Sequence, residues 1–386
     1  VLTEDMETFC NLYIQGGKVD LNRHKLTAQG DLLQSGGTLY VNGGELDVTG
    51  DYYIAGSRNI GDDGKENVTY CSAILEMVKE SDVVKVNGDF LTASEQNHGS
   101  YLIAGTMYLG GNFTQKPYTI GNTNIGNFNA TGTHKIVLNG ERRQILTFSA
   151  HIYNNGFANV EFQNKDIEFA SSIRGFELGE DINLTISAAS FGVSGTWKLN
   201  GHSLGEGGIN ATEQFNFTGG TIDFGGSTVT INGDLLQSGG TLYVNGGELD
   251  VTGDYYIAGS RGVGEDGKET ITSCSAILKM MKESDVVKVG GDFLTYSEQA
   301  HGNYLTAGTM YVGGNFTQKS PSSYNFAASG NHKIIFNGTG IQKITFADTA
   351  SGFANVEFQN KDIEFASDIR GFELGEDINL TISTES

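Results

Sequence analysis

The chain has 386 residues, 38% of them hydrophobic and 18% charged, and a formal net charge of −22. This composition is that of a folded protein, and its acidity argues against partners such as nucleic acid or an anionic membrane, which need clustered lysine and arginine. Glycine is abundant (55) and proline nearly absent (2). The balance favours β-structure with many tight turns, because proline removes hydrogen bonds inside a sheet. Since no apolar run reaches the length of a transmembrane helix, we expect no membrane insertion.

The first long element is a duplicated stretch. GDLLQSGGTLYVNGGELDVTGDYYIAGSR covers residues 30–58 and recurs letter for letter at 233–261. Further along, residues 173–187 are repeated at 369–383. We therefore divide the chain into two copies of one module, residues 1–187 and 188–386, because self-similarity at a fixed offset is typical of repeat architectures.

A shorter unit recurs inside each module. It reads apolar-x-apolar-x-Gly-(Asp/Asn)-apolar, and its glycines stand at positions 30, 50, 88, 111, 233, 253, 291 and 314. Most steps are 20 or 23 residues, and the step of 38 contains an insertion around residues 56–70. Short strands that alternate apolar and polar residues at this spacing predict an all-β parallel β-helix, or β-solenoid, with rungs of 20–23 residues and loop insertions. The usual crossover preference predicts a right-handed coil.

Two local features of this unit carry structural expectations. We expect the recurrent glycine to supply a positive φ where one strand turns into the next, and the neighbouring Asp or Asn to bond the turn backbone. CSAILEMVKESD (71–82) and its counterpart at 274–285 fit either a partly helical segment or a buried strand followed by a turn. We favour the strand, because its neighbours are strands.

Three phrases of the sequence resemble a known kind of protein: GGTLYVNGGELDVTGDYYI, SDVVKVNGDFLTASEQNHGSYLIAGTMYLGGNFTQK and ASGNHKIIFNGTGIQKITFADTASGFANVEFQN. They look like Gly-rich tandem β-solenoid modules of secreted bacterial surface proteins of the adhesin or filamentous-haemagglutinin type. The cellulose-binding tapirins, which also use a β-helix, are a related comparison. The resemblance implies attachment or presentation at the cell surface rather than catalysis.

From these observations we expect a non-catalytic, secreted or cell-surface adhesin segment, a rigid repeat that presents or attaches and that can assemble head to tail into fibres. Its partners would be an extracellular polysaccharide or neighbouring copies of itself. The alternative is a carbohydrate-binding module that recognises an extended polysaccharide. A polysaccharide lyase or hydrolase is a third hypothesis.

The residues that catalysis would need are poorly represented. A β-helical hydrolase needs paired carboxylates with a His-Gly and a basic residue on neighbouring rungs. The His-Gly pairs are His98-Gly99 and His301-Gly302, and we interpret the histidines as turn residues that cap a rung. The single Asp-Asp pair, Asp62-Asp63, falls in an insertion. We therefore assign no catalytic residue and predict that the chain is not an enzyme.

Two acidic loops are candidates for calcium, and no other cofactor is expected. Their residues are Asp62, Asp63 and Glu66 in the first copy and Glu265, Asp266 and Glu269 in the second. Oxygen-rich loops suit this hard cation, although they lack the EF-hand spacing, and a solvated acidic loop is the alternative. The three cysteines, Cys10, Cys71 and Cys274, have no zinc-site spacing.

Duplicated tyrosines are candidates for stacking on sugar rings. In each YY pair, a strand would turn one ring inward and leave the other half exposed. A row of such rings could bind a polysaccharide; the alternative is that tyrosine serves as a β-prone surface residue. The candidates are Tyr40, Tyr53, Tyr108, Tyr243, Tyr256 and Tyr311.

Overall fold

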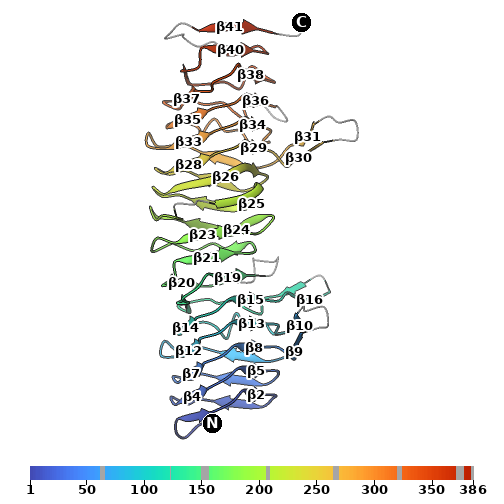
Figure 1. Cartoon of the computed structure of the whole chain (residues 1–386), viewed down its shortest axis with the longest axis vertical. Helices are drawn as coiled ribbons and strands as arrows, with labels where there is room; N and C mark the ends of the chain where they lie inside the picture. The colour runs from blue at the N-terminus through green and yellow to red at the C-terminus, as the bar shows by residue number, and fades with distance from the viewer. Residues whose placement is uncertain are drawn as a thin grey trace. The chain divides into compact units, whose positions relative to one another are not determined.

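The computed structural model describes residues 1–60, 66–121, 123–148, 156–205, 209–263, 269–319, 324–370 and 378–383. Every regular element in these ranges is a β-strand, and the long sheets are built from parallel strands (Figure 1). The predicted all-β fold of stacked parallel coils is therefore confirmed. The chain divides into two compact units, Val1–Phe176 and Glu177–Ser386, which we describe separately.

Unit 1 is a stack of coils with up to three strands per coil. The first face contains β1 (Met6–Thr8), β4 (Lys25–Ala28), β7 (Glu45–Val48), β12 (Val83–Val86), β14 (Thr106–Leu109), β18 (Lys135–Leu138) and β20 (Asn159–Phe162). The second contains β2 (Leu12–Ile14), β5 (Leu32–Gln34), β8 (Tyr52–Ile54), β13 (Phe90–Thr92), β15 (Phe113–Gln115), β19 (Gln144–Thr147) and β21 (Asp166–Phe169). The third contains β3 (Lys18–Asp20), β6 (Thr38–Tyr40) and β11 (Ile74–Glu76), and β22 (Ile173–Arg174) follows β21 along the chain.

Unit 2 repeats this arrangement. Its strands are β23 (Asn183–Ile186), β24 (Phe191–Lys198), β25 (Ile209–Asp223), β26 (Thr228–Gln237), β27 (Thr241–Tyr243), β28 (Glu248–Val251), β29 (Tyr255–Ile257), β32 (Ile277–Lys279), β33 (Val286–Val289), β34 (Phe293–Thr295), β35 (Thr309–Val312), β36 (Phe316–Gln318), β37 (Lys333–Phe336), β38 (Gln342–Phe346), β39 (Asn355–Phe358), β40 (Asp362–Phe365) and β41 (Asn379–Ile382). The registers confirm the predicted rung lengths: Leu26 pairs with Leu46, and Val84 pairs with Met107.

Antiparallel hairpins project from these coils. One in unit 1 joins β9 (Ser57–Ile60) to β10 (Glu66–Thr69), and another joins β16 (Tyr118–Ile120) to β17 (Thr123–Ile125). In unit 2 the equivalent of the first hairpin joins β30 (Ser260–Val263) to β31 (Glu269–Thr272). The segment 71–82 contains strand β11 and no helix, so the strand interpretation is confirmed there.

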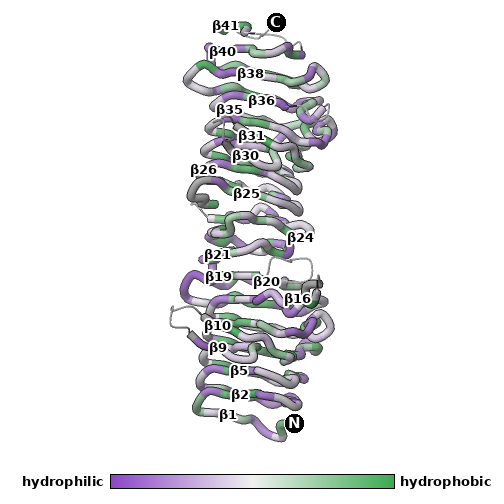
Figure 2. The backbone as a smooth tube through the Cα atoms, turned by 90° about the vertical axis from the view of Figure 1, so that its right-hand side faces the viewer, coloured by the Kyte–Doolittle hydropathy of each residue, from purple (hydrophilic) through white to green (hydrophobic). Residues whose placement is uncertain are grey.

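The core lies inside each stack of coils. Along β7, Leu46 and Val48 point inward and are fully buried, while the alternating Glu45 and Asp47 stay partly exposed. Figure 2 shows this alternation of apolar and polar positions along the coils. Aromatic residues on successive coils also contact one another inside: the rings of Phe90 and Phe113 stack 5.8 Å apart in unit 1. One coil alone could not bury these side chains, so each depends on its neighbours.

A ladder of carboxylates and amides joins the coils at the corner between the first and second faces. Oδ1 of Asp31 accepts the backbone N–H of Asp51 at 2.9 Å, and Oδ1 of Asp51 accepts the N–H of Asp89 at 2.7 Å. The ladder begins at Asn11 and continues through Asn112. In unit 2 it runs through Asp234, Asp254, Asp292 and Asn315. The Asp/Asn side chain thus bonds the next coil, not its own turn as the sequence predicted.

The expected reason for the corner glycines is wrong at most of these positions. Gly233 alone among the eight has a positive φ, of 123°. A Cβ at Gly50 would instead lie 2.3 Å from Oδ1 of Asp31, and one at Gly291 would lie 2.1 Å from Oδ1 of Asp254. The corner requires glycine because the ladder oxygen of the preceding coil occupies the space of a side chain. Positive φ occurs at the next corner, at Gly37 and Gly240 of the Gly-Gly pairs.

Several polar side chains inside the coils have hydrogen-bond partners. The hydroxyl of Tyr52 donates to Oε1 of the buried Gln34 at 2.6 Å, and Tyr255 does the same to Gln237. The fully buried Asp82 accepts backbone N–H groups from Val78 and Lys79 at 2.8 and 2.9 Å. These bonds satisfy polar groups that would otherwise be costly to bury.

Candidate functional site

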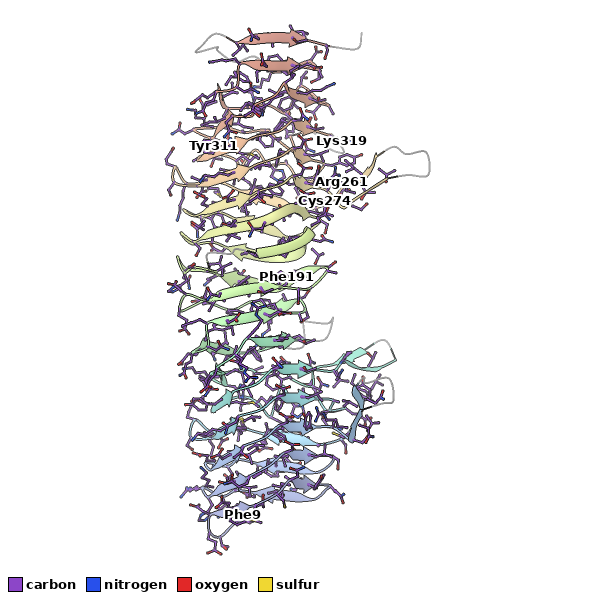
Figure 3. All side chains as sticks on the ribbon, in the orientation of Figure 1. Phe9, Phe191, Arg261, Cys274, Tyr311 and Lys319 are labelled. Carbon is purple, nitrogen blue, oxygen red and sulfur yellow. The ribbon has the colours of Figure 1, made fainter. Side chains whose placement is uncertain are left out.

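The six candidate tyrosines do not form a row within either unit. In unit 1, Tyr40 lies in β6 of the third face, Tyr53 in β8 of the second and Tyr108 in β14 of the first. Their counterparts in unit 2 lie in β27, β29 and β35. Figure 3 accordingly shows Tyr311 on the opposite side of unit 2 from Arg261, which covers Tyr256. A polysaccharide lying along one face would meet one of the three rings in each unit.

The expectation that one ring of each YY pair is half exposed is wrong, because both rings are buried. Tyr52 points into the core, whereas Tyr53 points outward and is covered by a second small cluster. The β9–β10 hairpin supplies Val68 to this cluster, and the guanidinium of Arg58 lies 4.2 Å from the ring centroid of Tyr53. Tyr52 and Tyr53 do point to opposite sides of the strand, as the alternation predicts. The sequence did not reveal that the insertion folds back and covers the outward ring.

The hydroxyl of Tyr53 is also occupied. It donates to Oδ2 of Asp51, the ladder residue whose other oxygen caps the next coil. Desolvation and this carboxylate together raise the pKa of Tyr53. Tyr256, Asp254 and Arg261 repeat the arrangement in unit 2, with a guanidinium-to-ring distance of 4.1 Å. These two tyrosines attach a hairpin to the coil stack.

Tyr108 and Tyr311 are half-buried on the first face. Tyr108 stands between Lys85 and Val137 of the neighbouring strands. In unit 2 a shallow groove of about 480 Å³ runs beside Tyr311 and is lined also by Asp250, Lys288, Asn337 and Thr339. A single ring in a groove of amides, hydroxyls and charges can contact one sugar residue.

Tyr40 and Tyr243 are half-buried on the third face and lie near amines. The Lys18 ammonium is 5.6 Å from the ring centroid of Tyr40, and the Lys279 ammonium is 5.9 Å from that of Tyr243. Desolvation, with smaller effects of Asp223 and Asp285, raises the pKa of Tyr243. The hydroxyl therefore stays neutral at physiological pH.

Most of the predicted calcium ligands lie outside the described residues. Asp62 and Asp63 belong to the range 61–65, and Glu265 and Asp266 belong to 264–268. Glu66 begins β10 and Glu269 begins β31, which places both at the base of a hairpin tip. Elsewhere in the described ranges, no three His, Cys, Asp or Glu side chains gather as metal ligands would. Calcium binding at the loops stays a prediction.

His98 and His301 are buried and cap a neighbouring strand. Nε2 of His301 accepts the backbone N–H of Leu278 at 3.3 Å, while Nδ1 lies 3.0 Å from the carbonyl oxygen of Gln299. This pairing fits the neutral ring with its proton on Nδ1. Burial lowers the pKa of each histidine to about 4. Both rings have a structural part in the coil and lie away from solvent.

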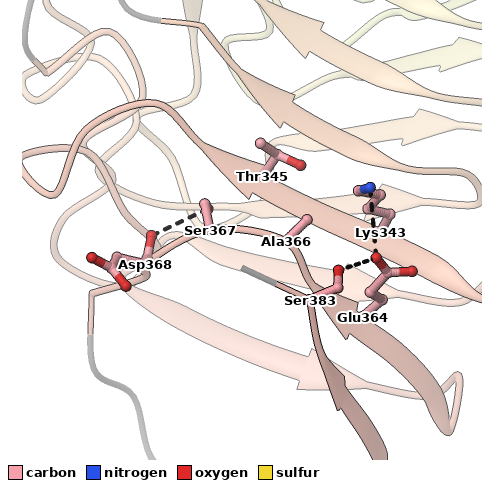
Figure 4. Close-up of a pocket in the computed structure, with 7 residues that line it drawn as sticks. All are labelled: Lys343, Thr345, Glu364, Ala366, Ser367, Asp368 and Ser383. Atoms are coloured by element: carbon pink, nitrogen blue, oxygen red, sulfur yellow. Dashed lines mark hydrogen bonds and ion pairs between the residues drawn. The ribbon is translucent and has the colours of Figure 1, made fainter. Parts of the chain in front are cut away.

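A groove of about 660 Å³ lies in unit 2 beside β38, β40 and β41 (Figure 4). Among the lining residues drawn in Figure 4, Nζ of Lys343 and Oε1 of Glu364 form an ion pair at 3.5 Å. The hydrogen bond from Ser383, helped by Lys343, lowers the pKa of Glu364. A carboxyl held ionised in this way is unsuited to donate a proton as a general acid.

Two features that differ between the copies were missed by the sequence reasoning. Arg142 and Arg143 line a groove of about 550 Å³ in unit 1, where unit 2 has Gly340 and Ile341. Tyr70 and Tyr118 meet between the two hairpins of unit 1, where unit 2 has Ser273 in place of Tyr70. The signal was available, because most of residues 30–187 recur in the second copy and a departure marks a locally changed surface.

Comparisons of the chain with models of protein families, with curated proteins and with solved structures find no match. The described segments include no helix long and apolar enough to cross a bilayer.

Proposed function

We propose that the chain is a non-catalytic structural segment of an extracellular surface protein, in which stacked coils give stiffness and carry hairpins outward. The observation that carries this proposal is that residues 30–116 and 233–319 repeat contacts between coils at equivalent positions. Asp51 and Asp254 accept equivalent backbone N–H groups, and His98 and His301 cap equivalent strands. Such repetition is expected where the function of the chain is to form a stiff stack of coils.

The resemblance to Gly-rich modules of secreted bacterial surface proteins supports a place outside the cell, as an adhesin or stalk. The outer rows of the sheets are consistent with an exterior that faces water. On the first face of unit 1, Lys25 pairs with Glu45 at 3.0 Å and with Asp47 at 2.7 Å. Exposed ion pairs of this kind add little stability but keep a β-surface polar.

The strand β41 supports the further idea that coils stack beyond it. Its inward residues Leu380 and Ile382 are 43% and 68% exposed. The identical residues of β23, Leu184 and Ile186, are each only 4% exposed, and the N–H of Leu184 donates to the carbonyl of Leu204 in the following coil. We propose that another coil, from the same protein or from a neighbouring molecule, covers β41.

Two measurements test this function. Incubation with a panel of polysaccharides should release neither reducing ends nor unsaturated products. Electron microscopy should show end-to-end association that is lost in a Leu380→Asp/Ile382→Asp variant if neighbouring molecules cover β41. Product release that disappears in Glu364→Gln would contradict the structural proposal, because it would assign chemistry to the groove of Figure 4.

Carbohydrate binding is the second candidate function, and one observation favours it. Tyr70 is 41% exposed although it contacts another aromatic ring. This ring lies on a hairpin surface that differs between the two copies, so the coils do not need it in order to fold.

A further inference from the structure

The two hairpins of unit 1 meet through a pair of tyrosines. Tyr70 follows β10 directly, and Tyr118 begins β16. The Tyr70 hydroxyl donates to the carbonyl oxygen of Pro117 at 2.6 Å, and the two ring centroids are 5.0 Å apart with an interplanar angle of 49°. Figure 1 places β10 and β16 on the same side of unit 1. The hairpins therefore form one surface.

This surface is aromatic and apolar at its centre. Tyr70 is 41% exposed, Tyr118 is half-buried, and Ile120 is 58% exposed. Tyr118 and Ile120 stand two residues apart on β16 and so point to the same side of that strand. Partial desolvation and the nearby Glu95 carboxylate raise the pKa of Tyr118. The Tyr118 hydroxyl is thus uncharged in neutral solution.

Unit 2 provides a natural comparison. Ser273 occupies the position of Tyr70, and its hydroxyl donates to Glu298, the counterpart of Glu95, at 2.6 Å. The segment between Lys319 and His332 is five residues shorter than the one between Lys116 and His134, because the offset between the copies falls there from 203 to 198. The coils beneath have nearly the same sequence in both units, although Tyr296 of unit 2 stands where unit 1 has Ala93. The aromatic surface is therefore an addition to the scaffold, which folds without it.

We propose that the face formed by Tyr70, Tyr118 and Ile120 binds an uncharged polysaccharide chain, with sugar rings packed on the aromatic and apolar side chains. This inference rests on the proposed scaffold function and adds the class of ligand that one hairpin surface binds. Tyrosine combines an apolar body with a polar tip, which matches the apolar faces and hydroxyl edges of a sugar.

Charge and size both favour this class of partner. A chain of net charge −22 repels polyanions. This repulsion disfavours acidic polysaccharides and nucleic acids as partners. A stable protein interface buries about 800 Å² on each partner, far more than two partly exposed rings and one isoleucine can offer. A few sugar residues need a much smaller area.

The test is binding of the full chain to insoluble, uncharged polysaccharides, cellulose and chitin, with pectate as the acidic comparison. Wild type should bind at least one uncharged polymer and not pectate. Tyr70→Ser, which copies the residue of unit 2, and Tyr118→Ala should each weaken binding about five- to tenfold. Tyr70→Phe keeps the ring and should retain binding. Tyr13→Ala removes an exposed tyrosine elsewhere in unit 1 and is the matched control.

Three results would overturn the inference: no binding to either uncharged polymer, equal binding of Tyr70→Ser and wild type, or an equal loss in Tyr13→Ala. Thermal unfolding of each variant shows whether it is folded, and Tyr70→Ser is expected to fold because unit 2 carries Ser273. Release of sugar products would contradict the scaffold function instead. Failed binding without such release overturns only the present inference.

Discussion

A single oxygen atom has two effects at each corner of the coil. Oδ1 of Asp89 accepts the backbone N–H of Asn112 at 2.7 Å, and it would lie 2.4 Å from a Cβ placed at Gly111. The Gly-(Asp/Asn) motif is therefore one unit: the acidic or amide residue of one coil determines that the next coil needs glycine. Asn11 and Asn112 show that an amide oxygen serves as well as a carboxylate.

The first prediction concerns this ladder. Asp89→Ala leaves the N–H of Asn112 without its partner and should lower the free energy of unfolding by about 1–3 kcal/mol. Asp89→Asn keeps the accepting oxygen and should cost much less. Urea unfolding of the two variants measures the difference. Equal losses would show that charge, rather than the hydrogen bond, matters at this corner.

The second prediction concerns the buried histidines. His134 and His332 lie next to Phe128 and Phe326 in the core, and burial lowers the pKa of each to about 4. An unfolded histidine has a pKa of about 6.5, so the unfolded chain binds the proton first. Their stabilising contribution is complete above pH 6.5 and is lost as the pH falls toward 4, by roughly 3 kcal/mol for each ring.

Unfolding midpoints measured between pH 7 and pH 4.5 test this dependence. His134→Leu should reduce the slope of stability against pH, and the double variant His134→Leu/His332→Leu should reduce it further. A slope that is the same in all three proteins would mean that other groups control the acid sensitivity.

At the level of elements, β41 and β23 have the same sequence and different surroundings. The third prediction uses this pair: residues 188–205, which follow β23, are grafted onto the chain in place of residues 384–386. Burying Leu380 and Ile382 under this coil should stabilise unit 2 by about 2–4 kcal/mol. Hydrogen exchange of residues 379–382 and the urea midpoint measure the effect.

The control for the graft carries serine at the positions of Phe191 and Trp197, which are fully buried in the natural coil. It should give little stabilisation, because the added backbone then brings few apolar atoms. If both grafts stabilise unit 2 equally, length alone is responsible and the covering coil is not specific.

The elements of the fold were largely predictable because their signals are local and repeated. Period-two alternation located the strands, and the spacing of the corner glycines measured the coils, as the pairing of Leu26 with Leu46 confirms. The cause of the glycine was not predictable. It depends on the side chain of Asp31 approaching Gly50 from another coil, a contact that no single window of sequence contains.

The candidate site was predicted less well, for a physical reason. Alternation says which side of a strand a residue faces, but it does not say what covers that side. Tyr53 faces outward as expected and is nevertheless buried under the β9–β10 hairpin. Tyr70 was overlooked because its setting depends on a second hairpin, 47 residues away along the chain, whose Pro117 carbonyl it bonds.

For the molecule as a whole, the coils that the two units share, in residues 30–116 and 233–319, have closely similar internal contacts and differ mainly in what they show to solvent. Unit 1 has the tyrosine surface and the Arg142–Arg143 groove, and unit 2 has serine, glycine and isoleucine at the corresponding positions. Interior contacts restrict change, because each side chain serves two coils. The hairpins are free of that restriction, which is why the proposed binding function is assigned to them.

The ladder also makes a stack of coils a one-way structure. Each oxygen reaches toward the coil that follows in the chain, as Asp31 does for Asp51 and Asp234 does for Asp254. A whole coil can therefore be inserted or deleted while the remaining coils keep their register. Insertion of part of a coil would leave a backbone N–H without its carboxylate acceptor. Growth by gene duplication therefore needs no new kind of contact between coils. If two stacks met through the ends that present ladder oxygens, acceptors would face acceptors and no hydrogen bond could form.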